Sequence, residues 1–491
     1  MRTHAIKHAV KRLRQVELFD SAGMPAALRS SLYWVIWGVT AGMLCFNVTG
    51  GAAWTGFQRE ILKANDFELG LIAAVPVAAN ILQILFSFIM ERKRNRRFVF
   101  LFFGLIGRSL WILIGLIPFI FSPAAHSVRI ASTIVLVVLI SSGNSFVNLG
   151  FGSLLGDLIP MRIRGQYFSS RQRVSLVAGI LSGLLVSVIV DSFGNAGYSM
   201  VLILAGLAGM ADIACFLRVQ WPPMAGAGDS GGETPKAMIR GVLKNKRFMT
   251  LCMFFTCWHF SVGLSSPFNN VYLIEVMHLS FLEITLFAQI VSNLTTVLSV
   301  TFWGRAIDRF GNKPVMRSVG YICMLLSGMW LFMKPGAIGL VVLFNFLSGL
   351  FWISLDLGQQ NLYLSLSARK NRSVYVAVFF AMINLCGIAL GNALGGALVQ
   401  GVFTGLAAKN LTLGGITLNK YHYVYLLSTA LRCAVMLLLF PRIEEEGSST
   451  MAEMFSSVRM GMVRRRNDFR RSVSETRVRK KIRKAIHHES E

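Results

Sequence analysis

Charged side chains are scarce in this chain. Asp, Glu, Lys and Arg make up only 15% of its 491 residues, whereas 54% are hydrophobic and the mean hydropathy is +0.58. This composition excludes a water-soluble globular domain. Apolar stretches of about 20 residues, the length of a helix that crosses a bilayer, recur along the sequence.

The sequence also lacks the motifs of several other protein classes. All seven cysteines fall inside predicted helices, so we expect neither a disulfide framework nor a metal site. Gly-x-Ser-x-Gly, His-Glu-x-x-His and phosphate-loop patterns are missing, so we expect no cofactor and no enzymatic activity, including activity on lipid. No apolar core precedes Tyr33, and a cleavable signal peptide is therefore not expected.

The apolar stretches predict an all-α membrane protein, because a backbone that faces lipid must satisfy its hydrogen bonds within its own segment. We predict twelve membrane-spanning helices, near residues 32–57, 68–90, 98–121, 128–150, 171–190, 197–219, 247–274, 281–303, 315–333, 337–364, 373–403 and 421–440. Two prolines and a Gly- and Ser-rich linker separate six helices from six. The expected parts are a cytoplasmic segment (1–30), a six-helix bundle (31–222), a cytoplasmic linker (223–246), a second bundle (247–441) and a basic cytoplasmic tail (442–491).

The positive charges are distributed unequally along the chain. The formal net charge is +26, yet of the 49 Lys and Arg residues only six fall in predicted outside loops: Arg59, Lys63, Arg129, Lys334, Lys409 and Lys420. This bias places both termini in the cytoplasm. The charge therefore does not indicate a nucleic-acid partner, and the sequence lacks the interleaved aromatic residues of a nucleic-acid-binding module.

The two halves of the chain repeat each other. Residues 91–96 align without gaps to residues 308–313, each set in a charged turn between two apolar stretches, and residues 164–167 align to residues 372–375. Small residues also recur four apart, a spacing that lets helices approach closely in lipid and that we expect at a moving interface between the halves. The stripes are Gly387, Gly391 and Gly395 in the eleventh span, Gly179 and Gly183 in the corresponding fifth span, and Gly70, Ala74 and Ala78 in the second span. These repeats predict two pseudo-symmetric bundles that can move against each other.

One of these turns resembles the signature loop of the major facilitator superfamily. The pattern Gly304-x-x-x-Asp308-Arg309-x-Gly311-x-Lys313 is similar to the superfamily's loop between the second and third helices of each half. The resemblance covers about residues 30–442, and the loop of residues 368–375 is similar to that of a bacterial branch. It implies alternating access to one central cavity between two six-helix bundles (the MFS fold).

The resemblance also implies a cytoplasmic latch, in which the acid and bases of this loop hold the two halves together. Carried over by position, the latch residues are Glu91, Arg92, Arg96, Asp157, Arg164, Asp308, Arg309, Gly311 and Lys313. The first copy departs from the pattern, because Arg94 stands where the glycine is expected. A simple excess of positive charge on the cytoplasmic side explains the bases but not the paired acids.

In the superfamily, helices one, four, seven and ten line the cavity. Here they carry the candidate cavity residues Asn47, Asn144, Asn148, His259, Asn269, Asp356, Gln359 and Gln360. Amides predominate over fixed charges, which favours a polar neutral, zwitterionic or weakly charged solute. Asp356 and His259 can titrate and are the candidates for proton coupling. Alternatively, His259 only bonds a neighbouring helix, and Asp356 pairs with Arg369 or Arg372.

Several charged residues and helix-breaking residues within the predicted spans are expected to have structural roles. Arg108 and Asp212 lie at similar depths and are predicted to neutralise each other as a structural pair, with a role in coupling as the alternative. Arg432 has no evident partner and is predicted to extend toward the cytoplasmic headgroups. Gly50-Gly51 and Pro267 are predicted to loosen or break the first and seventh helices.

The sequence as a whole predicts a secondary active transporter of a small solute, either proton-coupled or a uniporter, in the bacterial cytoplasmic (inner) membrane. Its expected partners are a small-molecule substrate and membrane lipids, and its expected form is a monomer. The basic tail is expected to lie on anionic lipid or to remain solvated. A non-transporting sensor or lipid-handling protein on the same fold stays open as the alternative.

Overall fold

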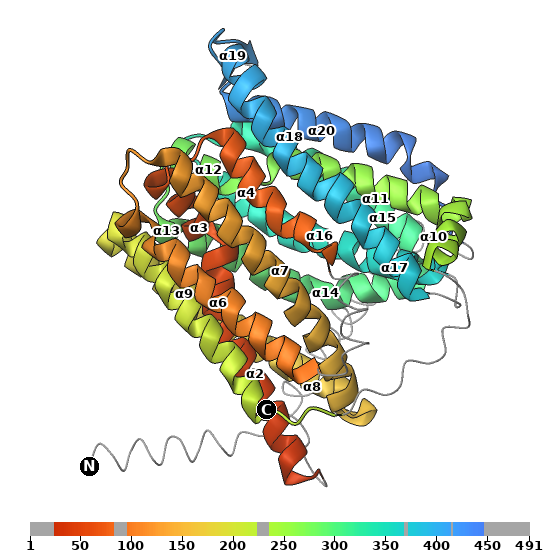
Figure 1. Cartoon of the computed structure of the whole chain (residues 1–491). Coiled ribbons are helices and arrows are strands. Elements are labelled where there is room, and N and C mark those ends of the chain that lie inside the picture. Colours follow the sequence, from red (N-terminus) through yellow and green to blue (C-terminus); the bar gives the residue numbers. More distant parts are fainter. Residues whose placement is uncertain (1–23, 83–95, 223–234, 368–371, 414–415, 446–491) are drawn as a thin grey trace, which may run out of the picture.

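The computed structural model describes residues 24–82, 96–222, 235–367, 372–413 and 416–445 (Figure 1). Within these residues, 11 helices are long and apolar enough to cross a membrane, and they coincide with all the predicted spans except the second. The second span, 68–90, runs into residues outside the described part, as does nearly all of the basic tail. The all-α membrane fold is confirmed.

The first half comprises the described residues between 24 and 222. Its elements are α2 (Ala26–Gly50), α3 (Ala52–Gly56), η1 (Phe57–Ile61), α4 (Asp66–Ala79), α6 (Arg96–Ile120), α7 (His126–Leu158), η2 (Met161–Ile163), α8 (Arg164–Phe193), α9 (Asn195–Cys215) and η3 (Phe216–Arg218). Helix α2 packs against α8 and α9, and α6 packs against α7 and α9.

The second half comprises the described residues between 235 and 445. Its elements are α10 (Pro235–Lys244), α11 (Lys246–Ser265), α12 (Phe268–Val271), η4 (Tyr272–Val276), α13 (Phe281–Ile284), η5 (Thr285–Ile290), α14 (Val291–Phe310), α15 (Asn312–Leu326), η6 (Ser327–Phe332), α16 (Ile338–Leu366), α17 (Arg372–Ala381), η7 (Met382–Ala389), α18 (Leu390–Leu398), η8 (Val399–Phe403), α19 (Thr404–Ala407), β1 (Thr412–Leu413), β2 (Ile416–Thr417), α20 (Lys420–Leu438) and η9 (Phe440–Arg442). The two short strands pair antiparallel.

Both predicted helix breaks are present. Helix α2 ends at Gly50 because Gly51 is extended, with φ −105° and ψ −172°, and α3 begins at the next residue. Pro267 stands between the end of α11 at Ser265 and the start of α12 at Phe268. Each break is followed by a π-helical turn, η1 or η4, a geometry that often accompanies functional sites.

Each π-helical turn leads into the next membrane helix through the same backbone path. We call residues 57–69 the first turn and residues 272–284 the second turn. One residue in each has positive φ, Lys63 at 55° and His278 at 54°. A capping box then starts the following helix, from Asn65 in the first turn and from Ser280 in the second. The duplication seen in the sequence therefore extends to backbone detail in regions where the side chains differ.

The glycine stripe of the eleventh span packs within its own half. A Cβ added to Gly391 or Gly395 would clash with carbonyl oxygens of Phe260 and Leu264, both in α11. The prediction that this stripe forms the moving interface is therefore wrong. Gly70 of α4, which belongs to the predicted small-residue stripe of the second span, does approach the other half closely: an added Cβ would lie 2.9 Å from the Cα of Gly396.

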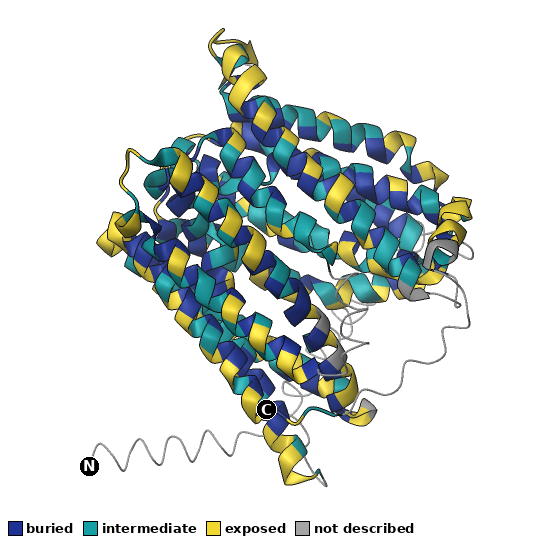
Figure 2. Ribbon diagram, in the orientation of Figure 1, coloured by how far each residue is buried: buried dark blue, intermediate teal, exposed yellow. Residues whose placement is uncertain are grey.

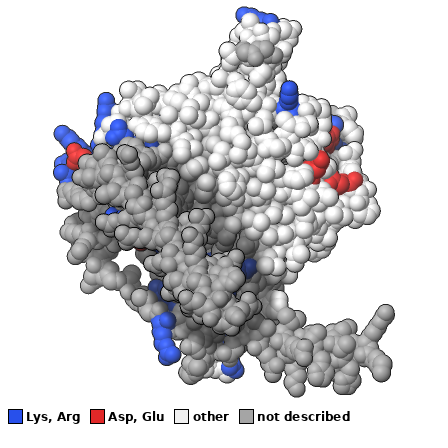
Figure 3. Space-filling view, turned by 180° about the vertical axis from the view of Figure 1, so that it is seen from behind, with Lys and Arg blue, Asp and Glu red and all other residues white. Residues whose placement is uncertain are grey.

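Large apolar side chains cover the outer faces of the helices. Leu298, Phe119 and Phe302 are 80%, 71% and 63% exposed, and exposed residues recur along the helix faces that point away from the core (Figure 2). Figure 3 shows the molecule from behind, and much of the surface that is not grey in this view has no charged side chains. Such a surface requires an apolar environment, as lipid provides.

Candidate functional site

A polar cavity of about 280 Å³ lies where the two halves meet. The first half contributes the end of α2 and the start of α3, and the second half contributes residues of α12, α13, η5, α14 and α16. Five amide side chains line it: Asn47, Asn270, Gln289, Asn293 and Asn345. None of the residues that line this cavity carries a charge. Amides offer both donors and acceptors, so the cavity suits a neutral polar solute.

Asn47 links three elements around this cavity. Its Nδ2 donates to the Gly179 carbonyl oxygen (2.6 Å) and to Ser182 Oγ (2.7 Å), both on α8. Its Oδ1 accepts from Nε2 of Gln289 in the second half (2.8 Å). The residue predicted to line the cavity does so, and it also joins the two halves.

Gln289 and Asn293 were missed by the sequence analysis. The family resemblance pointed to helices one, four, seven and ten, whereas these two residues lie on the eighth span, in η5 and α14. The available signal was a pair of amides four residues apart, and therefore on one helix face, within a membrane span, since polar groups in a membrane are costly without a partner.

Five other predicted cavity residues are not among the residues that line this cavity: Asn144, Asn148, Asp356, Gln359 and Gln360. Asn144 is half-buried and Asn148 exposed on α7. Asp356 and Gln360 are exposed on α16, and Gln359 is half-buried. Asp356 lies about three helical turns beyond Asn345 and therefore on the same face of α16 as this cavity residue.

His259 and Asn269 have other surroundings. His259 Nδ1 lies 2.9 Å from the carbonyl oxygen of Phe255, one turn earlier in its own helix. Because a carbonyl can only accept, Nδ1 carries the proton and Nε2 is left as an acceptor. Asn269 lines a different cavity, inside the second half, and its Oδ1 accepts from the hydroxyl of Tyr425 (3.2 Å).

A charge cluster joins the halves beside the first turn; it consists of Arg59, Asp66, Glu275, Lys420 and Tyr421. Arg59 pairs with Asp66, and its Nε lies 2.9 Å from Glu275 Oε1. Lys420 Nζ lies 2.6 Å from Asp66 Oδ2, and the Tyr421 hydroxyl donates to Glu275 Oε2 (2.7 Å). Asp66 is only 2% exposed, so its charge depends on these partners.

Two pseudo-equivalent contacts hold helix N-termini across the halves. The Asp191 carboxylate accepts from the backbone N–H groups of Phe281 (3.0 Å) and Leu282 (2.8 Å), at the start of α13. Gln400 Oε1 accepts from the backbone N–H of Asp66 (3.1 Å), at the start of α4. Side chains of each half therefore complete a helix start in the other half.

Further toward the middle of the bundle, two more bonds join the halves. The hydroxyl oxygens of Ser187 and Thr285 are 2.6 Å apart, and Asn392 Nδ2 donates to the Ala73 carbonyl oxygen (3.1 Å). Together with the charge cluster and the two helix-start contacts, these bonds define what we call the closed end of the molecule, which contains the first and second turns.

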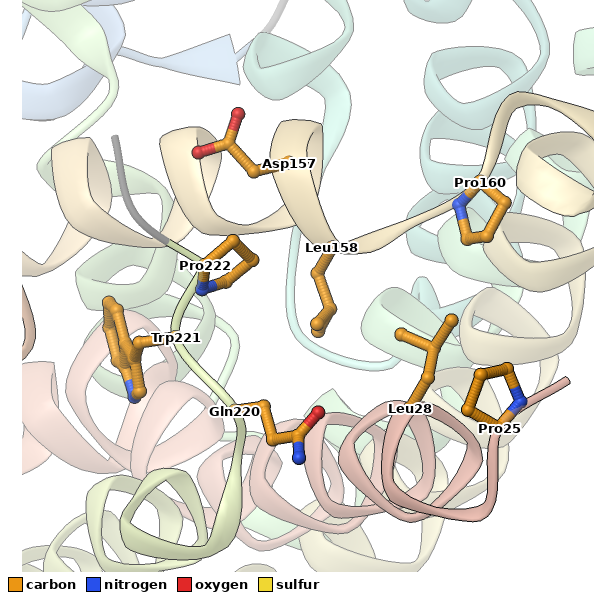
Figure 4. A pocket seen from close by; sticks show the side chains of 8 residues that line it. All are labelled: Pro25, Leu28, Asp157, Leu158, Pro160, Gln220, Trp221 and Pro222. Carbon is orange, nitrogen blue, oxygen red and sulfur yellow. The ribbon is translucent and has the colours of Figure 1, made fainter. Parts of the chain in front are cut away.

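At the opposite end, two of the predicted latch residues meet. Arg96 is buried, and its Nη1 lies 2.6 Å from Asp157 Oδ2. Arg96 Nη2 also donates to the Pro222 carbonyl oxygen (3.0 Å). A groove of about 670 Å³ lies beside Asp157. It is lined by the start of α2, the end of α7 and the segment that follows η3 (Figure 4). Glu91 and Arg92 lie outside the described residues.

Among the described residues, the remaining latch residues make contacts only within their own half. Arg164 Nη2 donates to the Gly156 carbonyl oxygen (3.0 Å). Gly311 ends α14 with φ 89°, a conformation that favours glycine, and Asp308 and Arg309 are exposed just before it. The Lys313 backbone N–H donates to a carboxylate at the start of the tail, described next.

Glu445 is a contact of the latch loop that sequence reasoning missed. Its carboxylate accepts from the backbone N–H groups of Asn312 (3.1 Å) and Lys313 (2.6 Å), at the start of α15. A carboxylate is favoured at a helix N-terminus because of the unpaired N–H groups and the helix dipole. The signal in the sequence was the run of three glutamates that begins four residues after the end of the last predicted helix.

The predicted pair of Arg108 and Asp212 is present inside the first half. Arg108 Nη2 lies 3.7 Å from Asp212 Oδ2, and Arg108 Nη1 lies 3.6 Å from the sulfur of Cys45. The pair joins α6 to α9, away from the amide-lined cavity, which fits a structural role.

Comparison with known proteins gives a consistent family assignment. A family model described as Major Facilitator Superfamily matches residues 35–295. The solved structure of the nucleoside transporter NupG is similar, with a TM-score of 0.66 and 14% identity over 84% of this chain and 100% of that chain. A comparison with curated protein sequences found no match.

Two further solved structures share the fold. One is a bacterial homolog of the human lysosomal transporter Spinster in an inward-facing, unoccupied conformation (TM-score 0.60, 14% identity, 86% of this chain and 95% of that chain). The other is the xylose transporter XylE from E. coli in an inward open conformation (TM-score 0.58, 13% identity, 88% and 98%). At these identities the likeness concerns the fold.

Proposed function

The chain belongs to the Major Facilitator Superfamily, and on that premise we propose that it is a secondary transporter that carries a small polar solute by alternating access. The observation that carries the proposal is the uneven distribution of contacts between the halves. Hydrogen bonds and ion pairs between described residues join the halves at the closed end and around the cavity, and none joins Asp157 or Lys313 to the other half. Contact on one side only is expected for one state of a rocking carrier.

The proposed state is inward-facing. In Figure 1 the helices of the two halves converge near α3, α12 and α13 and spread apart toward the start of α2 and toward α10 and α17. The positive-inside bias of the sequence assigns the closed end to the outside. Two of the similar structures are described as inward-facing or inward open, which supports the same state here.

The proposed solute is small, polar and uncharged. The cavity of about 280 Å³ offers amide donors and acceptors from both halves and no charged side chain. This size is near the lower limit of ligand pockets. Because similar structures are named for nucleosides and xylose, nucleosides and sugars are the first solutes to test.

Proton coupling is a further part of the proposal. Asp356 lies on the cavity-facing side of α16, and His259 has its Nε2 available. In proteoliposomes, replacing Asp356 by Asn should abolish uptake driven by a pH gradient and spare solute exchange. Unchanged gradient-driven uptake would assign the coupling elsewhere.

A disulfide across the closed end tests alternating access. Ser187 and Thr285 would both be replaced by Cys, because their hydroxyl oxygens are 2.6 Å apart. Locking this contact should abolish counterflow of a solute identified by thermal shift, and reduction should restore it. The matched control replaces Ser265 and Ser428 by Cys. Their hydroxyl oxygens are 3.2 Å apart, and both residues lie within the second half.

Both cysteine pairs keep the seven native cysteines, so the control accounts for unintended reactions of those thiols. Counterflow that persists in the cross-linked Ser187–Thr285 variant would contradict alternating access through this cavity. A folded protein that moves no solute would instead favour the sensor or lipid-handling alternative.

A further inference from the structure

A second cavity, of about 300 Å³, lies entirely within the second half. It is lined by residues of α11, α15, η6, α16 and α20 together with Asn269 of α12. It shares no lining residue with the amide-lined cavity. Its chemistry also differs, because it contains a charged side chain.

Arg432 is the charged residue of this second cavity. It is only 6% exposed, its Nε has no hydrogen-bond partner, and it forms no ion pair with a described residue. The prediction that it extends to the headgroups is therefore wrong. Its guanidinium lies 5.7 Å from the ring centroid of Trp352, a contact that offsets only part of the cost of burying a cation. A guanidinium also cannot lose its proton to relieve that cost.

Another buried arginine shows what a satisfied guanidinium looks like in this molecule. Arg129 is also 6% exposed, and its side chain donates to the carbonyl oxygens of Phe121, Ile61 and Pro118. Arg432 has no such acceptor among the residues that the structure describes, although it is equally buried. The difference indicates that the acceptor for Arg432 comes from outside the chain.

Two further donors face the same cavity. The hydroxyl oxygens of Ser327 and Ser348 are buried and have no hydrogen-bond partner within the described part of the chain. Both residues line the cavity with Arg432. One fixed positive charge with two free hydroxyl groups forms a set that an anion with several acceptor lone pairs satisfies.

The remaining walls are mainly apolar and aromatic, including Trp330, Phe344 and Trp352. The volume corresponds to about ten water molecules, which leaves room for a small organic ion. We propose that this cavity binds a small monocarboxylate, whose carboxylate lies against Arg432, Ser327 and Ser348 and whose apolar body lies against Trp330 and Trp352. This site is independent of the amide-lined cavity and of the proposed transport function.

The first test uses the full-length wild-type protein in detergent and a matched pair of probes. Benzoate and propionate at pH 7 should raise the melting temperature in a saturable way at constant ionic strength. Benzamide, which has the shape of benzoate without its charge, should not. Sodium chloride at the same concentration should have no comparable effect, and stabilisation by chloride alone would overturn the carboxylate assignment.

The second test changes the charged group. Arg432→Gln should raise the dissociation constant for benzoate by about tenfold to a hundredfold, because a charge-assisted hydrogen bond is lost. Arg432→Lys should have a smaller effect, since it keeps the charge but loses the planar fork. Arg218→Gln is the matched control: Arg218 also lies over a ring, Trp34 at 4.5 Å, but is exposed. It should leave benzoate binding unchanged.

If Arg432→Gln does not fold, Ser327→Ala and Ser348→Ala report on the same site, and each should weaken benzoate binding. Asn47→Ala should leave it unchanged, which separates this site from the amide-lined cavity. Equal stabilisation by benzoate and benzamide, or benzoate binding unaffected by the Arg432 and serine variants, would overturn the proposal.

Discussion

The first turn and the second turn have the same backbone and different ways of holding the halves together. In both, a π-helical turn is followed by a residue with positive φ and by a capping box. The first turn carries Arg59 and Asp66 and is held by charges from the second half. The second turn contributes Glu275 to the same charge cluster, and in addition its Phe281 packs on Tyr198 of the first half. A duplicated backbone therefore preserves the position of the closed end, while the side chains set its chemistry.

The same contrast appears where the following helices meet the other half. Gly70 of α4 approaches the backbone of α18, so this contact is made between main chains. At the pseudo-equivalent place in η5, Thr285 meets Ser187 through two hydroxyl groups. Close backbone contact leaves no room for a larger side chain, whereas the hydroxyl contact depends on a single bond.

The largest expected effect comes from removing the arginine of the first turn. Arg59→Gln should lower the free energy of unfolding by about 3 kcal/mol, because the buried Asp66 carboxylate keeps only Lys420 and Glu275 also loses the guanidinium. Unfolding by SDS titration in mixed micelles measures this change. The matched variant Ile274→Gln, in the second turn, should cost less because no charge is left unpaired.

A double variant separates charge from packing in this cluster. Arg59→Gln combined with Asp66→Asn should recover part of the loss, since the buried carboxylate is then neutral. A double variant whose loss equals the sum of the two single losses would show that the cluster does not act through paired charges.

A smaller effect is expected from adding a methyl group at the close backbone approach. Gly70→Ala should destabilise the closed end by about 1–3 kcal/mol, because the added Cβ would lie 2.5 Å from the Asn392 carbonyl oxygen. The pseudo-equivalent variant Thr285→Ala should cost about 1 kcal/mol, the value of one hydrogen bond. The melting temperature of each variant in the same detergent is the measurement. Equal shifts for both would contradict the distinction between backbone and side-chain contact.

The smallest effect is expected at the two helix starts that the opposite half completes. Asp191→Ala should cost about 1 kcal/mol and Gln400→Ala about half of that, because Asp191 accepts two N–H groups and Gln400 accepts one. Melting temperatures of the two variants in one detergent provide the comparison. A larger loss for Gln400→Ala would mean that its contribution comes from packing rather than from this bond.

Much of the architecture was predictable because it depends on local composition. Long apolar stretches form helices wherever lipid prevents the backbone from bonding to water. The breaks at Gly51 and Pro267 were also predictable, since they follow from the conformational preferences of single residues. The capping boxes of the two turns have a recognisable spacing as well, Asn65 with Glu68 and Ser280 with Glu283.

The candidate site was predictable only in part. Asn47 was identified from its place in the first helix, but its partner Gln289 was not, because the helix that carries Gln289 was not expected to line the cavity. The glycine stripe of the eleventh span was assigned to the wrong neighbour, because a stripe of small residues shows that a helix approaches another one closely without showing which.

The sequence by itself determined the class of molecule: a duplicated chain of apolar helices with positive charge concentrated in predicted cytoplasmic segments. Only the tertiary structure decided which polar groups meet. It brought Arg59 to Tyr421 and Asn47 to Gln289, and it left Arg432 buried without an acceptor from any described residue. Hydrophobicity and helix breaks are local properties, whereas the pairing of polar groups depends on how two bundles pack across a long separation in sequence.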